Sequence, residues 1–104
     1  MGTIGNISAW NYPYFVGCNV FIPGLITGNS IVYKPSEYST MTGLNIAALL
    51  HKSGVPKDVF VPIIGSGAEA GNAIVANKNI NGLFFTGSLK TGQTIYKVEK
   101  YIFL

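Results

Sequence analysis

The sequence predicts an α/β fold built on a doubly wound parallel sheet. Short runs of β-branched and apolar residues alternate with stretches of helical spacing, in the order β-α-β-α-β-α-β-α. One run, Val59–Ile64, is apolar on both faces, as expected for a strand that is covered on both sides. With 104 residues, the chain is long enough for at most one small domain.

Two strand–helix units are predicted in the first half of the chain. Strand Thr3–Ser8 precedes a buried helix over Pro13–Ile26, and strand Ser30–Tyr33 precedes a helix over Met41–Lys52. A proline is favoured in the first turn of a helix, which suits Pro13. Ser39 or Thr40 is the expected cap of the second helix. Gly54 and Pro56 are expected to end it.

Two more units are predicted in the second half. Strand Val59–Ile64 precedes a short helix over Ala68–Ala76, and strand Gly82–Phe85 precedes a helix over Leu89–Tyr96. In such a sheet, right-handed crossovers join the parallel strands. No repeat, low-complexity stretch or linker in the sequence indicates a second domain.

The composition indicates a globular protein without a nucleic-acid surface. With 48% apolar and 11% charged residues, the chain is expected to fold rather than to be disordered. Seven lysines, no arginine and four acidic residues give a net charge of +3, and the lysines are spread over separate elements. A nucleic-acid surface clusters its charge and uses arginine, so we predict a solvated surface and no nucleic-acid partner.

The single cysteine, Cys18, excludes an internal disulfide and is typical of a reducing compartment, so a cytoplasmic location is predicted. The N-terminal residues contain no basic stretch ahead of an apolar core, so no secretory signal is expected. The longest apolar region, Tyr14–Ile26, is interrupted by polar, proline and glycine residues and is shorter than the roughly 20 residues of a spanning helix. We therefore expect no membrane helix.

Three polar segments follow predicted strands. They are Trp10-Asn11-Tyr12-Pro13, Lys34-Pro35-Ser36-Glu37 and Phe85-Thr86-Gly87-Ser88. The carboxyl ends of parallel strands meet at one edge of an open α/β sheet, which is where such sheets bind ligands. The three segments therefore predict a single crevice.

The residues of the first two segments allow both a functional and a purely structural interpretation. Asn11 can donate to an oxygen that gains negative charge in acyl chemistry, or it can cap the next helix. Trp10 can cover a planar or phosphate-bearing ligand, or it can fill the core with its N–H hydrogen-bonded. Lys34 and Glu37 can bind the hydroxyls of a ribose, where a carboxylate favours NAD over NADP, or they can form an exposed ion pair.

Two predicted helix starts could meet a phosphate through their backbone N–H groups. The first is Gly65-Ser66-Gly67-Ala68-Glu69-Ala70-Gly71, whose third glycine comes one residue too late for the G-x-G-x-x-G dinucleotide fingerprint. The second follows Gly87, where Ser88 suits a helix cap as well as a ligand contact. In that helix, Gly92 would allow close packing on a neighbouring element.

Taken together, the segments resemble the aldehyde dehydrogenase family. Ile7-Ser8-Ala9-Trp10-Asn11-Tyr12-Pro13 is similar to its I-S-P-W-N-F/Y-P motif, Gly28-Asn29-Ser30-Ile31-Val32-Tyr33-Lys34-Pro35-Ser36-Glu37 to G-N-x-V-V-x-K-P-S/A-E, and Phe85-Thr86-Gly87-Ser88 to F-T-G-S. The resemblance implies a partial, Rossmann-like NAD(P)-binding domain over residues 1–96, followed by a divergent C-terminal tail over residues 97–104. Ala9 replaces a usual proline. Asn6 places an amide in a normally apolar strand position, where it needs a hydrogen-bond partner.

The resemblance also implies a role for each matched residue. Asn11 would be the side-chain half of the oxyanion hole. The cofactor, NAD or alternatively NADP, would be bound by Ser8, Trp10, Lys34, Ser36, Glu37, Gly67, Gly71, Gly87, Ser88 and Thr91. Within that set, Trp10 and Ser88 would lie near the pyrophosphate, and Lys34, Ser36 and Glu37 would surround the adenosine ribose.

The family reaction also needs groups that these residues do not supply. A cysteine thiolate attacks the aldehyde, and a glutamate activates water against the resulting thioester. Cys18 lies within the predicted apolar helix, so packing is its expected role, and Glu99 lacks the family's E-L-G-G-K context. His51 has no partner cluster, is expected at a surface or interface, and suggests no metal site. We therefore predict that the 104 residues alone do not oxidise aldehydes.

Three interpretations of the chain follow. It is a fragment or shortened homologue of an NAD(P)-dependent aldehyde dehydrogenase, a stand-alone nucleotide-binding or regulatory module, or a non-functional gene remnant. The first is the one that we predict. Its expected partners are the dinucleotide and either the remainder of such an enzyme or a second copy, because a shortened sheet exposes an edge.

Overall fold

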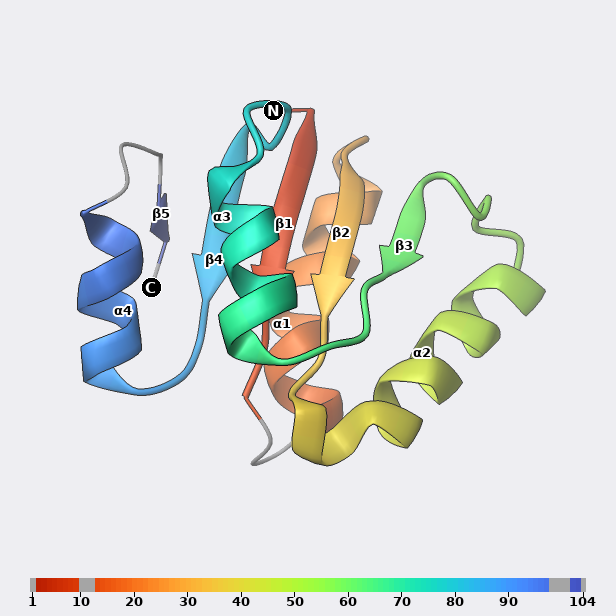
Figure 1. Cartoon of the computed structure of the whole chain (residues 1–104). Coiled ribbons are helices and arrows are strands. Elements are labelled where there is room, and N and C mark those ends of the chain that lie inside the picture. Colours follow the sequence, from red (N-terminus) through yellow and green to blue (C-terminus); the bar gives the residue numbers. More distant parts are fainter. Residues whose placement is uncertain (1, 10–12, 98–101, 104) are drawn as a thin grey trace.

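The structure, a computed structural model, describes residues 2–9, 13–97 and 102–103. Its centre is a five-stranded sheet in the order β3-β2-β1-β4-β5 (Figure 1). The strands are β1 (Thr3–Ile7), β2 (Ser30–Lys34), β3 (Phe60–Pro62), β4 (Gly82–Phe85) and β5 (Ile102–Phe103). All neighbouring pairs are parallel, so the strands end at the same edge of the sheet.

Four α-helices in the described ranges cover the two faces of this sheet. α1 (Pro13–Ile26) and α2 (Thr40–Lys52) pack on one face, and α3 (Asn72–Ala76) and α4 (Leu89–Tyr96) pack on the other (Figure 1). A short 3₁₀ helix, Glu37–Ser39, leads into α2, and a π-helical turn, Gly67–Gly71, leads into α3. The predicted doubly wound α/β fold is confirmed. None of these helices is long and apolar enough to cross a membrane.

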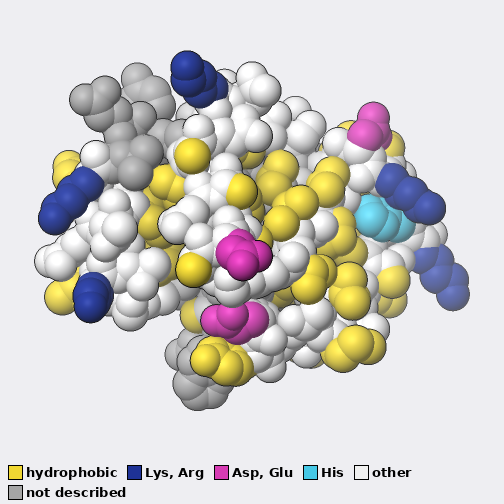
Figure 2. Space-filling view, viewed as in Figure 1, with side chains coloured by type: hydrophobic (Ala, Val, Ile, Leu, Met, Phe, Trp, Pro, Cys, Tyr) yellow, Lys and Arg dark blue, Asp and Glu magenta, His cyan; other side chains and the backbone are white. Residues whose placement is uncertain are grey.

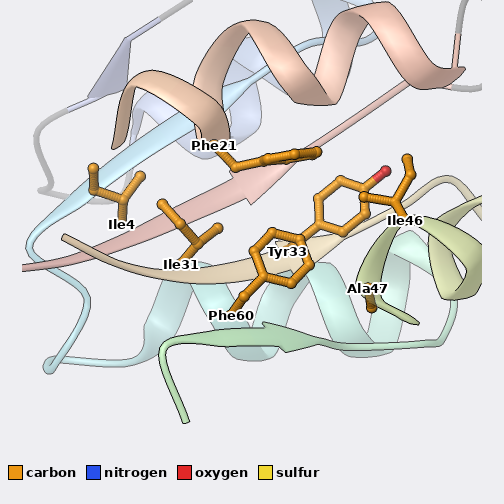
Figure 3. Packing of buried hydrophobic residues seen from close by; sticks show 7 residues of the cluster. All are labelled: Ile4, Phe21, Ile31, Tyr33, Ile46, Ala47 and Phe60. Atoms are coloured by element: carbon orange, nitrogen blue, oxygen red, sulfur yellow. The ribbon is translucent and has the colours of Figure 1, made fainter. Parts of the chain in front are cut away.

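The first core cluster lies between the sheet and the helices α1 and α2 (Figure 3). Its buried members are Ile4, Phe21, Ile31, Tyr33, Ile46, Ala47 and Phe60. The Phe21 ring packs edge to face on two others, with centroids 5.3 Å from Tyr33 and 5.0 Å from Phe60. Ile31 and Tyr33 face this cluster whereas Val32 faces the other, which is the alternation of a strand covered on both sides.

The second core cluster lies between the sheet and the helices α3 and α4. Its buried members are Ile7, Ile74, Val75, Ile80, Leu83, Phe85 and Ile95. Leu83 has no exposed surface, and Phe85 is 8% exposed at the end of β4. Phe85, at the end of β4, therefore packs in the same cluster as residues of α3 and α4, directly before Thr86-Gly87-Ser88.

Asn6 and Cys18 both lie between β1 and α1. The Asn6 side chain is buried, and its Nδ2 donates to the backbone oxygen of Gly17 in α1 at 3.3 Å, which supplies the partner that its position requires. Cys18 is half-buried against the first cluster, and burial raises the pKa of its thiol. The packing role predicted for Cys18 is confirmed.

Both ends of α2 depend on local hydrogen bonds. Ser39 occupies the N-cap position, as predicted, but its side chain makes no capping hydrogen bond. The Thr40 hydroxyl instead donates to the backbone oxygen of Glu37 at 3.1 Å. At the other end, Gly54 has a φ of 111°, and its N–H donates to the backbone oxygen of His51 at 3.2 Å.

Three segments differ from the sequence prediction. The ladder around β3 continues through Val59 and Ile63, but the regular strand covers only Phe60–Pro62. The predicted helix over Ala68–Ala76 opens with the π-helical turn, in which the Gly71 N–H reaches back five residues to the Ser66 oxygen at 3.3 Å. In the predicted tail, β5 pairs with Leu83 and Phe84 of β4, so the predicted order lacked one strand.

Candidate functional site

A crevice lies where β1, β2 and β4 end. Its volume is about 530 Å³, and residues from the segments that follow all three strands line it. They are Ile7, Ser8, Ala9, Lys34, Ser36, Glu37, Tyr38, Gly67, Phe85, Thr86, Gly87, Ser88 and Thr91. Because β1 pairs with β2 on one side and with β4 on the other, segments far apart in the sequence meet here.

Most of the cofactor residues predicted from the sequence meet in this crevice. Those that line it are Ser8, Lys34, Ser36, Glu37, Gly67, Gly87, Ser88 and Thr91. Gly71 is buried behind it, where an added Cβ would lie 3.9 Å from Cδ and Cε of Lys34. Trp10 and Asn11 lie outside the described residues, so their roles stay predictions.

Ser8 offers a buried hydroxyl to the crevice. Its backbone N–H donates to the Lys34 oxygen at 3.0 Å, which fixes the chain just after β1. Its side chain is 5% exposed, and Oγ has no hydrogen-bond partner within the described part of the chain. The Ser8 hydroxyl slightly lowers the pKa of the Tyr33 phenol. The two hydroxyl groups do not form a hydrogen bond with each other. Ser8 Oγ is therefore a buried hydroxyl without a hydrogen-bond partner among the described residues, in a residue that lines the crevice.

Lys34 places a buried ammonium at the carboxyl end of β2. The side chain is 3% exposed, and Nζ donates to the backbone oxygen of Pro35 at 3.1 Å. Burial lowers the pKa of Lys34, and the charge of Glu37 partly offsets that effect. Because the Lys34 side chain is buried, the alternative of an exposed Lys34–Glu37 ion pair is wrong.

The segment after Lys34 forms the rim of the crevice. Ser36 accepts a hydrogen bond from the Tyr38 N–H at 3.2 Å and so starts the 3₁₀ helix Glu37–Ser39. Glu37 is exposed, and Tyr38 beside it is 82% exposed. The carboxylate and the phenol can thus contact a ligand without losing a partner inside the protein.

Hydroxyl groups cap both helix starts at the crevice. Ser66 Oγ accepts from the Glu69 N–H at 3.1 Å, directly before Gly67. Ser88 Oγ accepts from the Thr91 N–H at 3.2 Å and donates to Thr91 Oγ1 at 2.9 Å. The capping interpretation of Ser88 is confirmed, and its place in the crevice leaves the ligand interpretation open as well.

Sequence reasoning did not include Tyr38 among the site residues. A tyrosine after a polar pair is a weak signal in the sequence, because residue type alone does not show that the ring is exposed. His51 lies away from the crevice, where it is partly buried and its Nε2 lies 2.8 Å from the Phe60 oxygen. In the described part of the chain, no three His, Cys, Asp or Glu side chains come together as metal ligands would.

On the face shown in Figure 2, the lysine side chains lie apart from one another around the periphery and form no basic patch. This arrangement agrees with the solvated surface predicted from the sequence.

The chain matches known aldehyde dehydrogenases along almost its whole length. A model of the aldehyde dehydrogenase family matches residues 1–101. Hydroxyisobutyraldehyde dehydrogenase of Mycolicibacterium austroafricanum is 38% identical over 98 residues, which are 94% of this chain and 19% of that protein. Betaine aldehyde dehydrogenase of Bacillus subtilis is 37% identical over 97 residues, covering 93% of this chain and 20% of that protein.

Solved structures give the same result. Aldehyde dehydrogenase KauB of Pseudomonas aeruginosa superposes with a TM-score of 0.95 at 35% identity, over 99% of this chain and 22% of that one. Betaine aldehyde dehydrogenase of Staphylococcus aureus in complex with NAD+ superposes with a TM-score of 0.92 at 33% identity, over 97% of this chain and 21% of that one. The chain spans about a fifth of the length of the relatives that it matches. It belongs to the aldehyde dehydrogenase family.

Proposed function

We propose that this chain is the part of an NAD(P)-dependent aldehyde dehydrogenase that holds the adenosine and pyrophosphate portion of the cofactor. The observation that carries this proposal is the crevice at the ends of β1, β2 and β4, which Ser8, Lys34 and Glu37 line together. Ligands of open α/β sheets bind at this edge.

The groups in the crevice fit a dinucleotide. Ser8 Oγ is buried without a partner in the described chain, and the Lys34 ammonium uses one of its three N–H groups on Pro35. Gly67 adds open space, since no atom lies within 4 Å of the position that a Cβ would take. A dinucleotide offers hydroxyls and an anionic pyrophosphate, which use such donors and such space.

Each group has a distinct task in this proposal. Lys34 and Glu37 hold the adenosine ribose, and the Glu37 carboxylate repels an added 2′-phosphate, which favours NAD over NADP. Ser88 and the N-terminus of α4 face the pyrophosphate, because the positive end of a helix dipole favours an anion. When bound, NAD(P) accepts the hydride in the family reaction.

The reacting groups of the family are not supplied by the described residues. Cys18 is half-buried against the core, and its thiol has a raised pKa, which suits packing and not nucleophilic attack. Asn11 is proposed as an oxyanion-hole donor on the resemblance of its motif. The purified chain should therefore form no NADH from NAD and an aldehyde above background, and a rate that survives further purification would overturn this statement. A cytoplasmic location is proposed on the one free cysteine.

Calorimetric titration with NAD and NADP tests the cofactor proposal. Wild type should bind NAD at or below millimolar concentration. Lys34→Ala should weaken binding about tenfold, the loss expected for a hydrogen bond from a charged group. Glu37→Gln should reduce the preference for NAD over NADP by several-fold, because it removes the repulsion of the 2′-phosphate.

The matched control is Glu69→Gln, which removes an exposed carboxylate that does not line the crevice. Its affinity for NAD should equal that of wild type. Absence of any heat at millimolar NAD, with the chain folded by circular dichroism, would reject the cofactor proposal. An equal loss in Lys34→Ala and Glu69→Gln would show that the loss is not specific to the crevice.

A further inference from the structure

Tyr38 places a large aromatic side chain at the rim of the crevice. It lines the crevice together with Glu37, yet its side chain is 82% exposed. Within the described residues, the side chain makes no hydrogen bond and packs on no other aromatic ring. A ligand in the crevice can therefore cover this ring without displacing any contact of the folded chain.

The backbone that carries Tyr38 is held in place. Its N–H donates to Ser36 Oγ at 3.2 Å, and the Ser39 N–H donates to the Ser36 oxygen at 3.0 Å. The Thr40 hydroxyl donates to the Glu37 oxygen at 3.1 Å, and the turn runs directly into α2, which packs in the first core cluster. Only the side chain is left to move, and a tyrosine has just two side-chain torsions to fix on contact.

The place of Tyr38 beside Glu37 decides which part of a ligand its ring meets. The two residues follow each other in one 3₁₀ turn and line the same crevice, so a group held by the Glu37 carboxylate is within reach of the ring. In the proposed function, on which the role of Tyr38 rests, that group is the adenosine ribose. The face of an aromatic ring is apolar and partly negative, so it suits the C–H groups of a ribose. It disfavours a 2′-phosphate, which is anionic and strongly hydrated.

We propose that Tyr38 is a specificity-determining residue, whose ring packs on the adenosine ribose of NAD and loses this contact when the ribose carries a 2′-phosphate. The contact removes apolar ring surface from water, which favours the binding of NAD. Glu37 disfavours the same phosphate by charge repulsion. The two residues thus favour NAD by different physical means, and only the charge repulsion is screened by salt.

Calorimetric titration of folded variants with NAD and NADP measures the effect, with displacement of NAD giving the affinity for NADP where its own heat is small. Tyr38→Ala should weaken NAD binding by about two- to tenfold, the range for one aromatic contact, and should not weaken NADP binding. Tyr38→Phe should keep the wild-type preference, because it keeps the ring. The matched control is Tyr96→Ala, which removes a 72% exposed tyrosine of α4 outside the crevice and should not change the preference.

Salt separates the aromatic contact from the charge repulsion. The loss of preference caused by Tyr38→Ala should be the same in dilute buffer and at about 1 M salt, where the screening length is about 3 Å. The loss caused by Glu37→Gln should become smaller at the higher salt. If the effect of Tyr38→Ala also became smaller, it would be a charge effect, and the proposed contact would be wrong.

The failure of this proposal can be told apart from the failure of the cofactor proposal. If wild type binds NAD and Tyr38→Ala has the same preference as wild type, the role of Tyr38 is rejected and the cofactor site stands. An equal change in Tyr38→Ala and Tyr96→Ala would reject the role of Tyr38 as well. If folded wild type binds neither nucleotide, the cofactor proposal fails, and the role of Tyr38 fails with it.

Discussion

Two glycines that line the crevice differ in the space around them, and one added methyl group tests this difference. A Cβ on Gly87 would lie 2.6 Å from Cζ of Phe85, about 0.8 Å inside the 3.4 Å limit of ordinary contact. The Phe85 ring is part of the second core cluster, so it cannot retreat without moving its neighbours. We expect Gly87→Ala to lower the free energy of unfolding by about 1–3 kcal/mol, the usual cost of overpacking.

The matched substitution is Gly67→Ala. No atom lies within 4 Å of the Cβ position at Gly67, and its φ is not in the positive region. Alanine should therefore stabilise the chain by about 0.4–1 kcal/mol, because it restricts the unfolded state more than glycine does. The same methyl group would project into the space proposed for the cofactor, so NAD affinity should fall although stability rises.

Urea unfolding followed by far-UV circular dichroism measures both variants. A loss of 1–3 kcal/mol lowers the urea midpoint by on the order of 1 M for a small domain. Gly67→Ala should raise that midpoint slightly. Equal midpoints for the two variants would refute the reasoning, since they would show that Phe85 yields to the added methyl group at no cost.

Two further predictions concern the core. Leu83→Ala should lower the free energy of unfolding by about 2–5 kcal/mol, because the side chain is fully buried. Leu89→Ala should change the free energy of unfolding by less than about 0.5 kcal/mol, because that side chain is 78% exposed. Similar losses in both variants, measured in urea, would contradict the assignment of the second cluster. Burial raises the pKa of Tyr33 from 10.0 to about 12, with a smaller contribution from the charge of Cys18. The folded chain then keeps a proton that the unfolded chain loses, so this contribution to stability is complete below pH 10 and declines as the pH rises from 10 to 12. Tyr33→Phe should remove that decline, and an unchanged pH profile in this variant would count against the burial of the phenol.

The fold could be predicted because local signals agree with the tertiary arrangement. The bounds of α1, β4 and α4 match the prediction, since Pro13 begins one helix and Ser88 caps another. The π-helical turn could not be predicted in this way, because it depends on a single hydrogen bond between Gly71 and Ser66 that is displaced by one residue from the α pattern. β5 was missed because its two residues form a strand only by pairing with the edge of β4.

The residues of the crevice could be predicted, but the state of Lys34 could not. The sequence left a ribose contact and an exposed ion pair with Glu37 equally open, because both fit the spacing of Lys34 and Glu37. The structure excludes only the exposed ion pair, because the Lys34 side chain is almost completely buried, with its aliphatic stem 3.9 Å from the position that a Cβ on Gly71 would take. The third glycine comes too late for a dinucleotide fingerprint and lies behind the crevice, beside the lysine stem. Lys34 lines the crevice, and within the described chain its ammonium uses one of three N–H groups on Pro35, so the proposed ribose contact would use the other two.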